Sequence, residues 1–191
     1  MAPVPHLTGV PSLAALHGSD RGGERPPPPA EKPLPTALVV ERITHQDVPE
    51  ICSLYRRVWE SPPATGLPTD LVKSWQPTPL EFTSWMEGVT YFAARRDGRL
   101  VGVIGCEVER GNCHLVSLAV DPMARRQGIG SALVSAGVEW ARHANATEVW
   151  ADGLARLTAV SALLKHLGFN ECGVLHKHEW SEDVRLFERI L

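Results

Sequence analysis

Two arginines stand directly in front of a glycine-rich turn in the stretch RRQGIG, residues 125–130. The guanidinium groups of Arg125 and Arg126 can form charge-assisted, two-pronged hydrogen bonds with phosphate oxygens. Gly128 and Gly130 carry no Cβ, so an anion could approach the backbone closely there. A helical pattern begins at about Gly128, and the first amides of a helix are unpaired and partly positive. These residues at this spacing predict a cradle for a pyrophosphate group.

Two better-known phosphate-binding patterns do not describe this stretch. The G-K-[ST] end of a Walker A loop is absent, and so is the G-x-G-x-x-G of the dinucleotide fingerprint. A nucleotide-phosphate hydrolase is therefore not expected, because it would need a phosphate-binding lysine and metal ligands. Taken alone, RRQGIG also fits an ordinary helix start with two solvated arginines.

The elements around the cradle follow from hydrophobic periodicity. Apolar runs between turn signals predict strands at 37–43, 91–95, 100–108, 113–120, 148–151, 173–175 and 184–191. Helical spacing of apolar residues predicts helices that start after Asp47, after Thr78, near Gly128 and at Thr158. The order β-α-α-β-β-β-α-β-α-β-β predicts the α/β (α+β) class, with a mixed, mostly antiparallel central sheet and helices on both faces.

Capping signals support three of these helix starts. Asp47 with Glu50 and Thr78 with Glu81 both have the spacing of a capping box, with a proline in the first turn. Thr158 is expected to cap the last helix through its hydroxyl group.

Composition indicates a soluble globular protein and narrows its partners. The chain has 191 residues, 43% of them hydrophobic, and a formal net charge of -3 at pH 7. The acidic balance argues against nucleic-acid binding, and no apolar run approaches the ~20 residues needed to span a membrane. The four cysteines form no C-x-x-C pair. Free thiols in a reducing, cytoplasmic location are therefore expected.

The distribution of prolines divides the chain into two parts near residue 37. Residues 1–36 hold nine of the 16 prolines and have no periodic apolar face. Such a segment buries too little apolar surface to offset the entropy of ordering, so a disordered Pro-rich tail is predicted. A ligand for a proline-recognising partner is the alternative. Residues 37–191 are expected to form a single domain.

The cradle and three further stretches resemble a known family. Arg125-x-x-Gly128-x-Gly130, after a strand that ends in LAVDP, is similar to the acetyl-CoA motif of the GNAT N-acetyltransferase superfamily. ERITHQDVPEI, GRLVGVIGC and LLKHLGF are similar to its other parts, so the resemblance covers most of 37–191. It implies a GNAT-like acyl-CoA N-acyltransferase fold, whose sheet splays open between the strand ending at Val120 and the strand at 148–151.

The resemblance implies an acyltransferase that moves an acetyl group from acetyl-CoA to a primary amine of a small molecule, peptide or protein. The pantetheine arm would pair with the strand at Leu118 and Val120. A main-chain N–H near Leu118 or Ala119 would stabilise the oxyanion, and amides at 127–131 would hold the pyrophosphate. The implied cofactor-binding residues are Leu118, Ala119, Val120, Arg125, Arg126, Gln127, Gly128, Ile129, Gly130 and Ser131.

Direct attack requires a neutral amine, so a proton acceptor is expected near the thioester. His114 is the first candidate, because imidazole accepts a proton near neutral pH and because strand alternation would place His114 on the same face as Leu118. Glu107 and Asp152 are the other catalytic candidates. A structural strand histidine and a turn-capping Asp152 are the alternatives.

The chain departs from the family at the residue that protonates the leaving thiolate. The resemblance implies a tyrosine five residues before Phe169, where this chain has Leu164. Water, Ser161 or His166 could supply the proton instead. Leu164 also leaves open a non-catalytic acyl-CoA-binding module, with a sensor or regulatory role.

The acceptor amine is not specified by the sequence. In the family, the region between the first two helices often lines the acceptor pocket, and here it contains Trp75 and Trp85. The alternative for both is packing in the core. His176 and His178 have the spacing of metal ligands on a strand, but no further ligand lies near them in sequence, so no metal is expected. A homodimer is left open.

Overall fold

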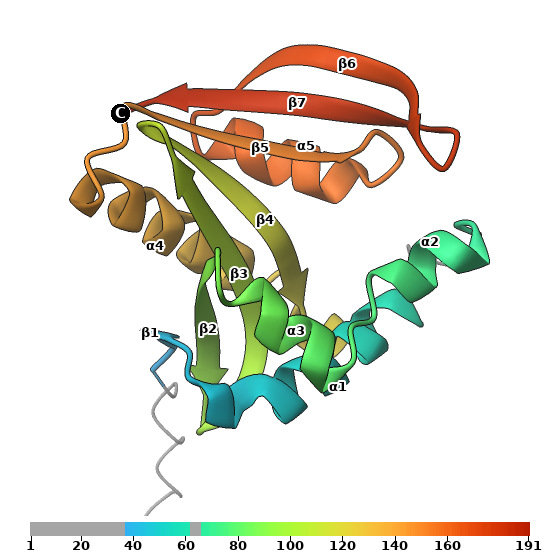
Figure 1. Cartoon of the computed structure of the whole chain (residues 1–191), viewed down its shortest axis with the longest axis vertical. Helices are drawn as coiled ribbons and strands as arrows, with labels where there is room; N and C mark the ends of the chain where they lie inside the picture. The colour runs from blue at the N-terminus through green and yellow to red at the C-terminus, as the bar shows by residue number, and fades with distance from the viewer. Residues whose placement is uncertain (1–36, 62–65) are drawn as a thin grey trace, which may run out of the picture. The chain divides into compact units, whose positions relative to one another are not determined.

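The computed structural model describes residues 37–61 and 66–191 (Figure 1). The Pro-rich tail predicted at 1–36 lies outside these residues. The described strands are β1 (Val39–Arg42), β2 (Thr90–Arg96), β3 (Arg99–Glu109), β4 (Asn112–Val120), β5 (Glu148–Leu154), β6 (Asn170–Glu179) and β7 (Glu182–Ile190). The described helices are α1 (Val48–Trp59), α2 (Thr69–Ser74), α3 (Pro79–Trp85), α4 (Ile129–His143) and α5 (Thr158–His166), with short 3-10 turns η1 (His45–Asp47) and η2 (Pro122–Ala124).

The strands form one sheet in the order β1-β2-β3-β4-β5-β7-β6. Within the described chain, every neighbouring pair is antiparallel except β4 and β5. Helix α4 connects these two strands, because a parallel pair needs a long crossover. The predicted mixed, mostly antiparallel sheet is confirmed. β5 and β6 are longer than predicted, because pairing with β7 orders polar residues that carry no apolar alternation.

Helices cover both faces of the sheet, as predicted (Figure 1). On one face, α1 and α3 contribute Ile51 and Phe82 to a buried cluster that includes Ala93 of β2. On the other face, α4 contributes Leu133 to a cluster that includes Ala94. Because successive strand residues point to opposite faces, Ala93 and Ala94 show that the two clusters lie on either side of the sheet.

The predicted capping box of α3 is confirmed. The Thr78 N–H donates to Glu81 Oε2 at 2.7 Å, and the Glu81 N–H donates to Thr78 Oγ1 at 3.3 Å. The predicted cap of α5 is wrong: Thr158 is the first residue of the helix, and Leu157 holds the capping position without a side-chain hydrogen bond.

The predicted capping box at Asp47 is also wrong. Asp47 makes no side-chain hydrogen bond to the start of α1. Its carboxylate instead accepts from the Thr44 N–H at 2.7 Å and pairs with Arg95. The reason is that Thr44 is the N-cap of η1, the turn that precedes α1, and forms the capping box of that turn with Asp47.

Helix α2 was not indicated by apolar spacing. Of its six residues only Leu71 is buried, which is too few for a periodic signal. No helix in the described ranges, α2 included, is long and apolar enough to cross a membrane.

A β-bulge interrupts β4 at Ser117, whose φ of +58° lies in the left-handed region. The register with β3 shifts by one residue there, since Val103 pairs with Ala119 whereas Gly105 pairs with Val116. The bulge inserts one extra residue into β4.

The extra residue reverses the alternation of side chains along β4. Leu115, before the bulge, and Leu118, after it, both pack in the cluster on the α4 face, while Ala119 packs on the α1 face. His114 therefore points to the face opposite Leu118. The predicted shared face of His114 and Leu118 is wrong, because alternation holds only along an uninterrupted strand.

Gly105 allows β3 to pack closely against its neighbours beside the bulge. A Cβ at this position would lie 2.7 Å from Val116 Cγ2 and 2.8 Å from both Tyr91 Cε1 and Val89 Cγ1. No ordinary carbon–carbon contact is that short, so any larger residue must push all three side chains apart.

Gly105→Ala should therefore lower the free energy of unfolding by roughly 1–3 kcal/mol, as overpacking does in other cores. Chemical denaturation measures the change. The matched control is Gly173→Ala in β6, where the new Cβ would meet its nearest atom at 3.6 Å. Equal stability of the two variants would contradict the close packing described for Gly105.

Candidate functional site

The sheet opens between β4 and β5 after four residue pairs. Residues 112–115 pair with residues 148–151, and from Val116 to Val120 β4 has no β5 partner. β5 itself continues against β7 as far as Leu154. The predicted splay between these strands is confirmed. It leaves one edge of β4 without a strand partner among the described residues, and such an edge can pair with an extended ligand.

A groove of about 590 Å³ runs along this edge, and we call it the splay groove. It is walled by the end of β4, the start of α4 and one side of α5. Nine of the ten residues predicted to bind the cofactor line it: Leu118, Ala119, Val120, Arg125, Arg126, Gly128, Ile129, Gly130 and Ser131. Gln127 does not line it, because its side chain bonds to the Arg96 side chain and to the Met123 carbonyl.

The start of α4 presents unpaired amides to the splay groove. The N-cap residue Gly128 has a φ of +79°, and no atom lies within 4 Å of the place a Cβ would occupy. The first hydrogen bond of the helix runs from the Ala132 N–H to the Gly128 carbonyl at 3.0 Å. The amides of residues 129–131 therefore have no partner within the helix, as an anion-binding helix start requires.

Gly130 has a second role that the sequence pattern did not indicate. A Cβ there would lie 3.0 Å from Leu163 Cδ2 of α5. The glycine therefore lets α5 approach α4 across the groove.

An ion pair between the buried Asp121 and the partly exposed Arg57 holds the loop that leads into the cradle. Asp121 is only 2% exposed, and its carboxylate accepts from Arg57 Nε at 3.1 Å and Nη2 at 3.0 Å. Its other oxygen accepts from the Met123 N–H at 3.0 Å. Sequence analysis did not assign this role. The signal was present in the Asp-Pro pair at the end of the strand, which is typical of a capping turn.

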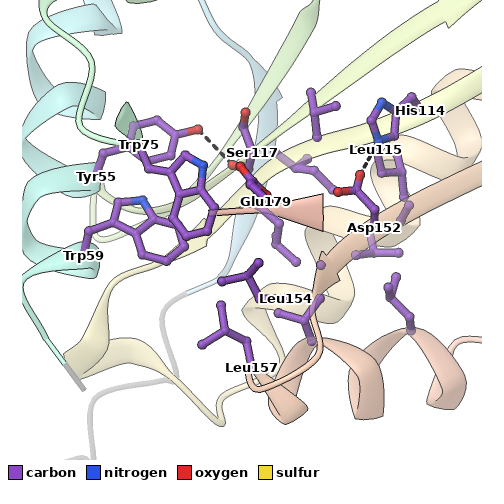
Figure 2. Close-up of a pocket in the computed structure, with 18 of the residues that line it drawn as sticks. Tyr55, Trp59, Trp75, His114, Leu115, Ser117, Asp152, Leu154, Leu157 and Glu179 are labelled. Atoms are coloured by element: carbon purple, nitrogen blue, oxygen red, sulfur yellow. Dashed lines mark hydrogen bonds and ion pairs between the residues drawn. The ribbon is translucent and has the colours of Figure 1, made fainter. Parts of the chain in front are cut away.

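A second cavity of about 300 Å³ adjoins the splay groove, and we call it the inner pocket. The two cavities share Trp59, Leu118, Leu157 and Val160 as lining residues. Figure 2 shows Trp59 and Trp75 on one side of the inner pocket and the pair His114–Asp152 on the other. Trp75 and Trp85, predicted either for a pocket or for the core, both line this cavity.

His114 lies at the centre of the polar side of the inner pocket. Its register partners are Glu107 on β3 and Trp150 on β5. Nε2 lies 2.6 Å from Asp152 Oδ1, and Nδ1 lies 3.9 Å from Glu107 Oε2. The ring stacks on Trp150, with centroids 3.5 Å apart and 5° between the planes. The fold thus brings together the three residues proposed from sequence as proton acceptors.

Two buried tyrosines face the bulge. The Tyr55 hydroxyl donates to the Ser117 carbonyl at 2.8 Å, and burial raises the pKa of Tyr55 well above its ordinary value. Burial also raises the pKa of Tyr91, and a hydrogen bond with the Ser117 side chain opposes this change. Both phenols therefore stay protonated and hold the bulge as hydrogen-bonding groups.

Glu179 is a polar residue of the inner pocket that sequence analysis missed. It lies at the end of β6, directly before the turn at Trp180 and Ser181, both of which have positive φ. Its carboxylate lies beside the Trp75 side chain (Figure 2). Burial, with the nearby charge of Asp152, raises the pKa of Glu179. No local pattern in the sequence relates β6 to Trp75, so only the fold reveals this residue.

Leu164 and Trp59 are two further residues that line the cavities. Leu164 is 2% exposed and lines the inner pocket with an apolar side chain. The Trp59 indole N–H, where the cavities meet, is buried and has no hydrogen-bond partner within the described chain. A buried donor of this kind is costly unless a ligand oxygen satisfies it.

A model of the acetyltransferase (GNAT) family matches residues 49–169, which contain the splay groove, His114 and Leu164. The chain belongs to the GNAT acetyltransferase family. Within the described residues of this GNAT chain, no three His, Cys, Asp or Glu side chains gather in a way that could hold a metal ion.

Two relatives illustrate what this GNAT chain is similar to. It is 31% identical over 147 residues to a mycothiol acetyltransferase of Clavibacter michiganensis, a match that covers 69% of this chain and 45% of that protein. It is 28% identical over 94 residues to the ribosomal protein bS18-alanine N-acetyltransferase of Escherichia coli, covering 49% of this chain and 64% of that protein. The chain spans about half the length of the mycothiol acetyltransferases it matches.

Solved structures share the fold. The ribosomal-protein-S18-alanine N-acetyltransferase from Escherichia coli has a TM-score of 0.66 at 21% identity, covering 81% of this chain and 94% of that one. The PaiA N-acetyltransferase from Thermoplasma acidophilum, solved in complex with coenzyme A, has a TM-score of 0.68 at 14% identity, covering 81% and 99%. At these identities the likeness shows the GNAT fold alone.

The open space at Gly128 gives a test of the splay groove. Gly128→Asp would place a carboxylate beside the unpaired amides, and should weaken binding of acetyl-CoA by at least about tenfold through like-charge repulsion. Isothermal titration calorimetry measures the affinity.

Gly111→Asp is the matched control for backbone strain. Gly111 has a φ of +83°, also with no atom within 4 Å of its missing Cβ, but lies in the β3–β4 turn away from the groove. It should bind acetyl-CoA within about twofold of the wild type, because screening by salt removes distant charge effects. Equal affinity of both folded variants would exclude the groove as the anion site.

Proposed function

We propose that this chain is an N-acetyltransferase that moves the acetyl group of acetyl-CoA to a primary amine. The observation that carries the proposal is the junction of two cavities at the splay. One has an unpaired strand edge and a helix start beside two arginines, and the other contains His114 and two carboxylates. An extended anionic substrate and a cationic amine can therefore meet at Leu118, which lines both.

The residues of the splay groove fit acetyl-CoA in size and charge. The unpaired edge of β4 supplies backbone groups for the pantetheine amides. The amides of residues 129–131 with Arg125 and Arg126 supply donors for the pyrophosphate. Burial lowers the pKa of Arg125, although Asp121 opposes this change. A partly desolvated guanidinium gains more from a phosphate than an exposed one does.

His114 is proposed to receive the proton that the amine loses. An imidazole that donates its Nε2–H to Asp152 keeps Nδ1 as the acceptor, and Glu107 stabilises the imidazolium that forms. The amine nitrogen first forms a C–N bond to the thioester carbon, and a main-chain N–H near Leu118 or Ala119 stabilises the oxyanion of the resulting tetrahedral intermediate. The C–S bond then breaks as the carbonyl re-forms. The amine proton passes to His114, directly or through water, and the thiolate leaves.

Protonation of the leaving thiolate has no obvious donor in the inner pocket. Leu164 occupies the position where the family resemblance implied a tyrosine. The two tyrosines of the described chain, Tyr55 and Tyr91, interact instead with Ser117. We propose that water protonates the thiolate, which is a good leaving group without an acid because a free thiol has a pKa near 8.5. Leu164 is also the observation that favours the second candidate, a non-catalytic acyl-CoA-binding module.

The deciding experiment mixes the full chain with acetyl-CoA and a panel of primary amines, and measures release of the free thiol of CoA. Transfer predicts thiol release together with an acetylated amine detected by mass spectrometry. Binding of acetyl-CoA without thiol release, across small amines, peptide N-termini and lysine side chains, would favour the binding module.

A cytoplasmic location is part of this proposal. All four cysteines are free, and the buried pair Cys106 and Cys113 lies in hydrogen-bond contact without a disulfide. Thiols in this state fit a reducing compartment, where acetyl-CoA is also available.

His114→Ala tests the proton acceptor. Removing the imidazole should lower turnover about 10²-fold at neutral pH while acetyl-CoA still binds. Raising the pH should partly restore turnover, because more of the amine is then already neutral. Steady-state kinetics across pH, with calorimetry for binding, measures both effects.

His143→Ala is the control, since His143 is exposed on the last turn of α4. It should behave like the wild type at every pH. Wild-type turnover in His114→Ala would move the role of base to Glu107 or Asp152.

A further inference from the structure

The polar lining of the inner pocket is acidic. Asp152 and Glu179 both line it, and each lies close enough to influence the other, since the charge of Asp152 helps to raise the pKa of Glu179. No lysine or arginine occurs among the described residues that line this cavity. Asp152 pairs with the imidazole of His114 at 2.6 Å, and the charge of His178 opposes the rise in the pKa of Glu179. With no lysine or arginine beside them, the two carboxylates still leave a negative site that one bound cation can compensate.

The wall opposite His114 and Asp152 is aromatic, and Glu179 lies beside it (Figure 2). Trp59 and Trp75 pack with ring centroids 4.4 Å apart, and Tyr55 and Trp85 line the same cavity. Aromatic faces stabilise flat apolar groups by contact and attract ammonium groups through their quadrupole. The volume of about 300 Å³ is at the lower end of small-molecule sites.

Glu179 is held in this pocket by a contact between distant segments. The hairpin of β6 and β7 ends just beyond it, and the pairing of these strands is irregular between Leu175 and Glu179. The carboxylate lies beside the side chain of Trp75, which directly follows α2 (Figure 2). Acetyl transfer as described above assigns no task to Glu179, although it is partly buried beside the polar cluster.

We propose that the acceptor is a small primary amine with a flat apolar body and no carboxylate, and that Glu179 binds its ammonium group. This inference rests on the proposed acetyl transfer. Glu179, with Asp152, holds the cation at the acidic side, and the tryptophan wall holds the apolar body. Proton transfer to His114 then takes place within the same cavity.

The same charges exclude free α-amino acids. An amino acid would bring its own carboxylate, a third, to within a few ångströms of Asp152 and Glu179, and the described lining of the pocket offers no lysine or arginine to pair with it. Like charges placed together in a partly desolvated site repel each other strongly. The pocket therefore selects an amine over the amino acid of the same skeleton, because it attracts the ammonium group and repels the carboxylate.

Matched pairs of acceptors test this specificity in the wild-type chain. Tryptamine against tryptophan and phenethylamine against phenylalanine differ only in the carboxylate. With saturating acetyl-CoA, kcat/KM for each amine should exceed that for its amino acid by about 100-fold or more. A tripeptide amide with a free N-terminus is the third class of acceptor. Equal or faster acetylation of the amino acids or of the peptide would overturn the inference and leave acetyl transfer intact.

Glu179→Gln tests the binding residue itself. It keeps the size and one acceptor oxygen while removing the charge, so KM for tryptamine should rise about tenfold or more, with kcat changed by less than about threefold. The control is Glu182→Gln, which removes the same charge from the register partner of Glu179. Glu182 does not line the pocket and pairs with Arg156. The KM of the Glu182→Gln variant for tryptamine should stay unchanged.

The two sets of measurements separate the possible failures. An unchanged KM in folded Glu179→Gln overturns the role of Glu179. If that variant does not fold, the wild-type ratios for the matched acceptors still decide the substrate class. Absence of thiol release with every acceptor, while calorimetry shows acetyl-CoA binding, contradicts the proposed transferase and this inference together.

Discussion

Only four residue pairs join the two halves of the sheet, residues 112–115 of β4 against 148–151 of β5. Both cavities depend on the shortness of this pairing. If the strands stayed paired to their ends, β5 would cover the backbone of β4 from Val116 onwards, and no extended ligand could add to it. The pairing stops where the bulge at Ser117 changes the course of β4. Tyr55 fixes that bulge from α1 through a hydroxyl that burial keeps protonated.

The two cavities differ in charge. His114, Asp152 and Glu179 line the inner pocket, whereas Arg125 and Arg126 line the splay groove, and Leu118 lines both. A polyanion and a cation are therefore attracted to different openings of one cavity system. They approach each other only at the shared lining residues, of which Leu118 and Trp59 lie on β4 and α1.

Sequence analysis succeeded where a feature depends on neighbouring residues. RRQGIG predicted the start of α4, and Thr78 with Glu81 predicted a capping box, because helix starts are specified within a few positions. It failed where distant residues decide. The ion pair of Asp47 with Arg95 of β2 lies outside any local pattern, whereas the error in its helix start was local, since Thr44 forms the capping box with Asp47. The left-handed conformation of Ser117 has no marker in SLAVDP, so the face of Leu118 was misassigned. Glu179 reaches Trp75 only through the hairpin of β6 and β7. Chemistry at the cradle was thus more predictable than the shape of the pocket beside it.

Helix α1 contacts the loop before the cradle, the bulge of β4 and both cavities. Arg57 binds Asp121 ahead of the cradle, Tyr55 holds the bulge, and Trp59 lines both cavities. Positions 57, 55 and 59 of one helix thus contact the loop, the strand and the two cavities. A ligand in either cavity therefore contacts the same helix through Trp59. Any coupling between the two cavities through α1 must be reciprocal: whatever free energy a ligand in one adds to binding in the other, a ligand in the second adds to binding in the first.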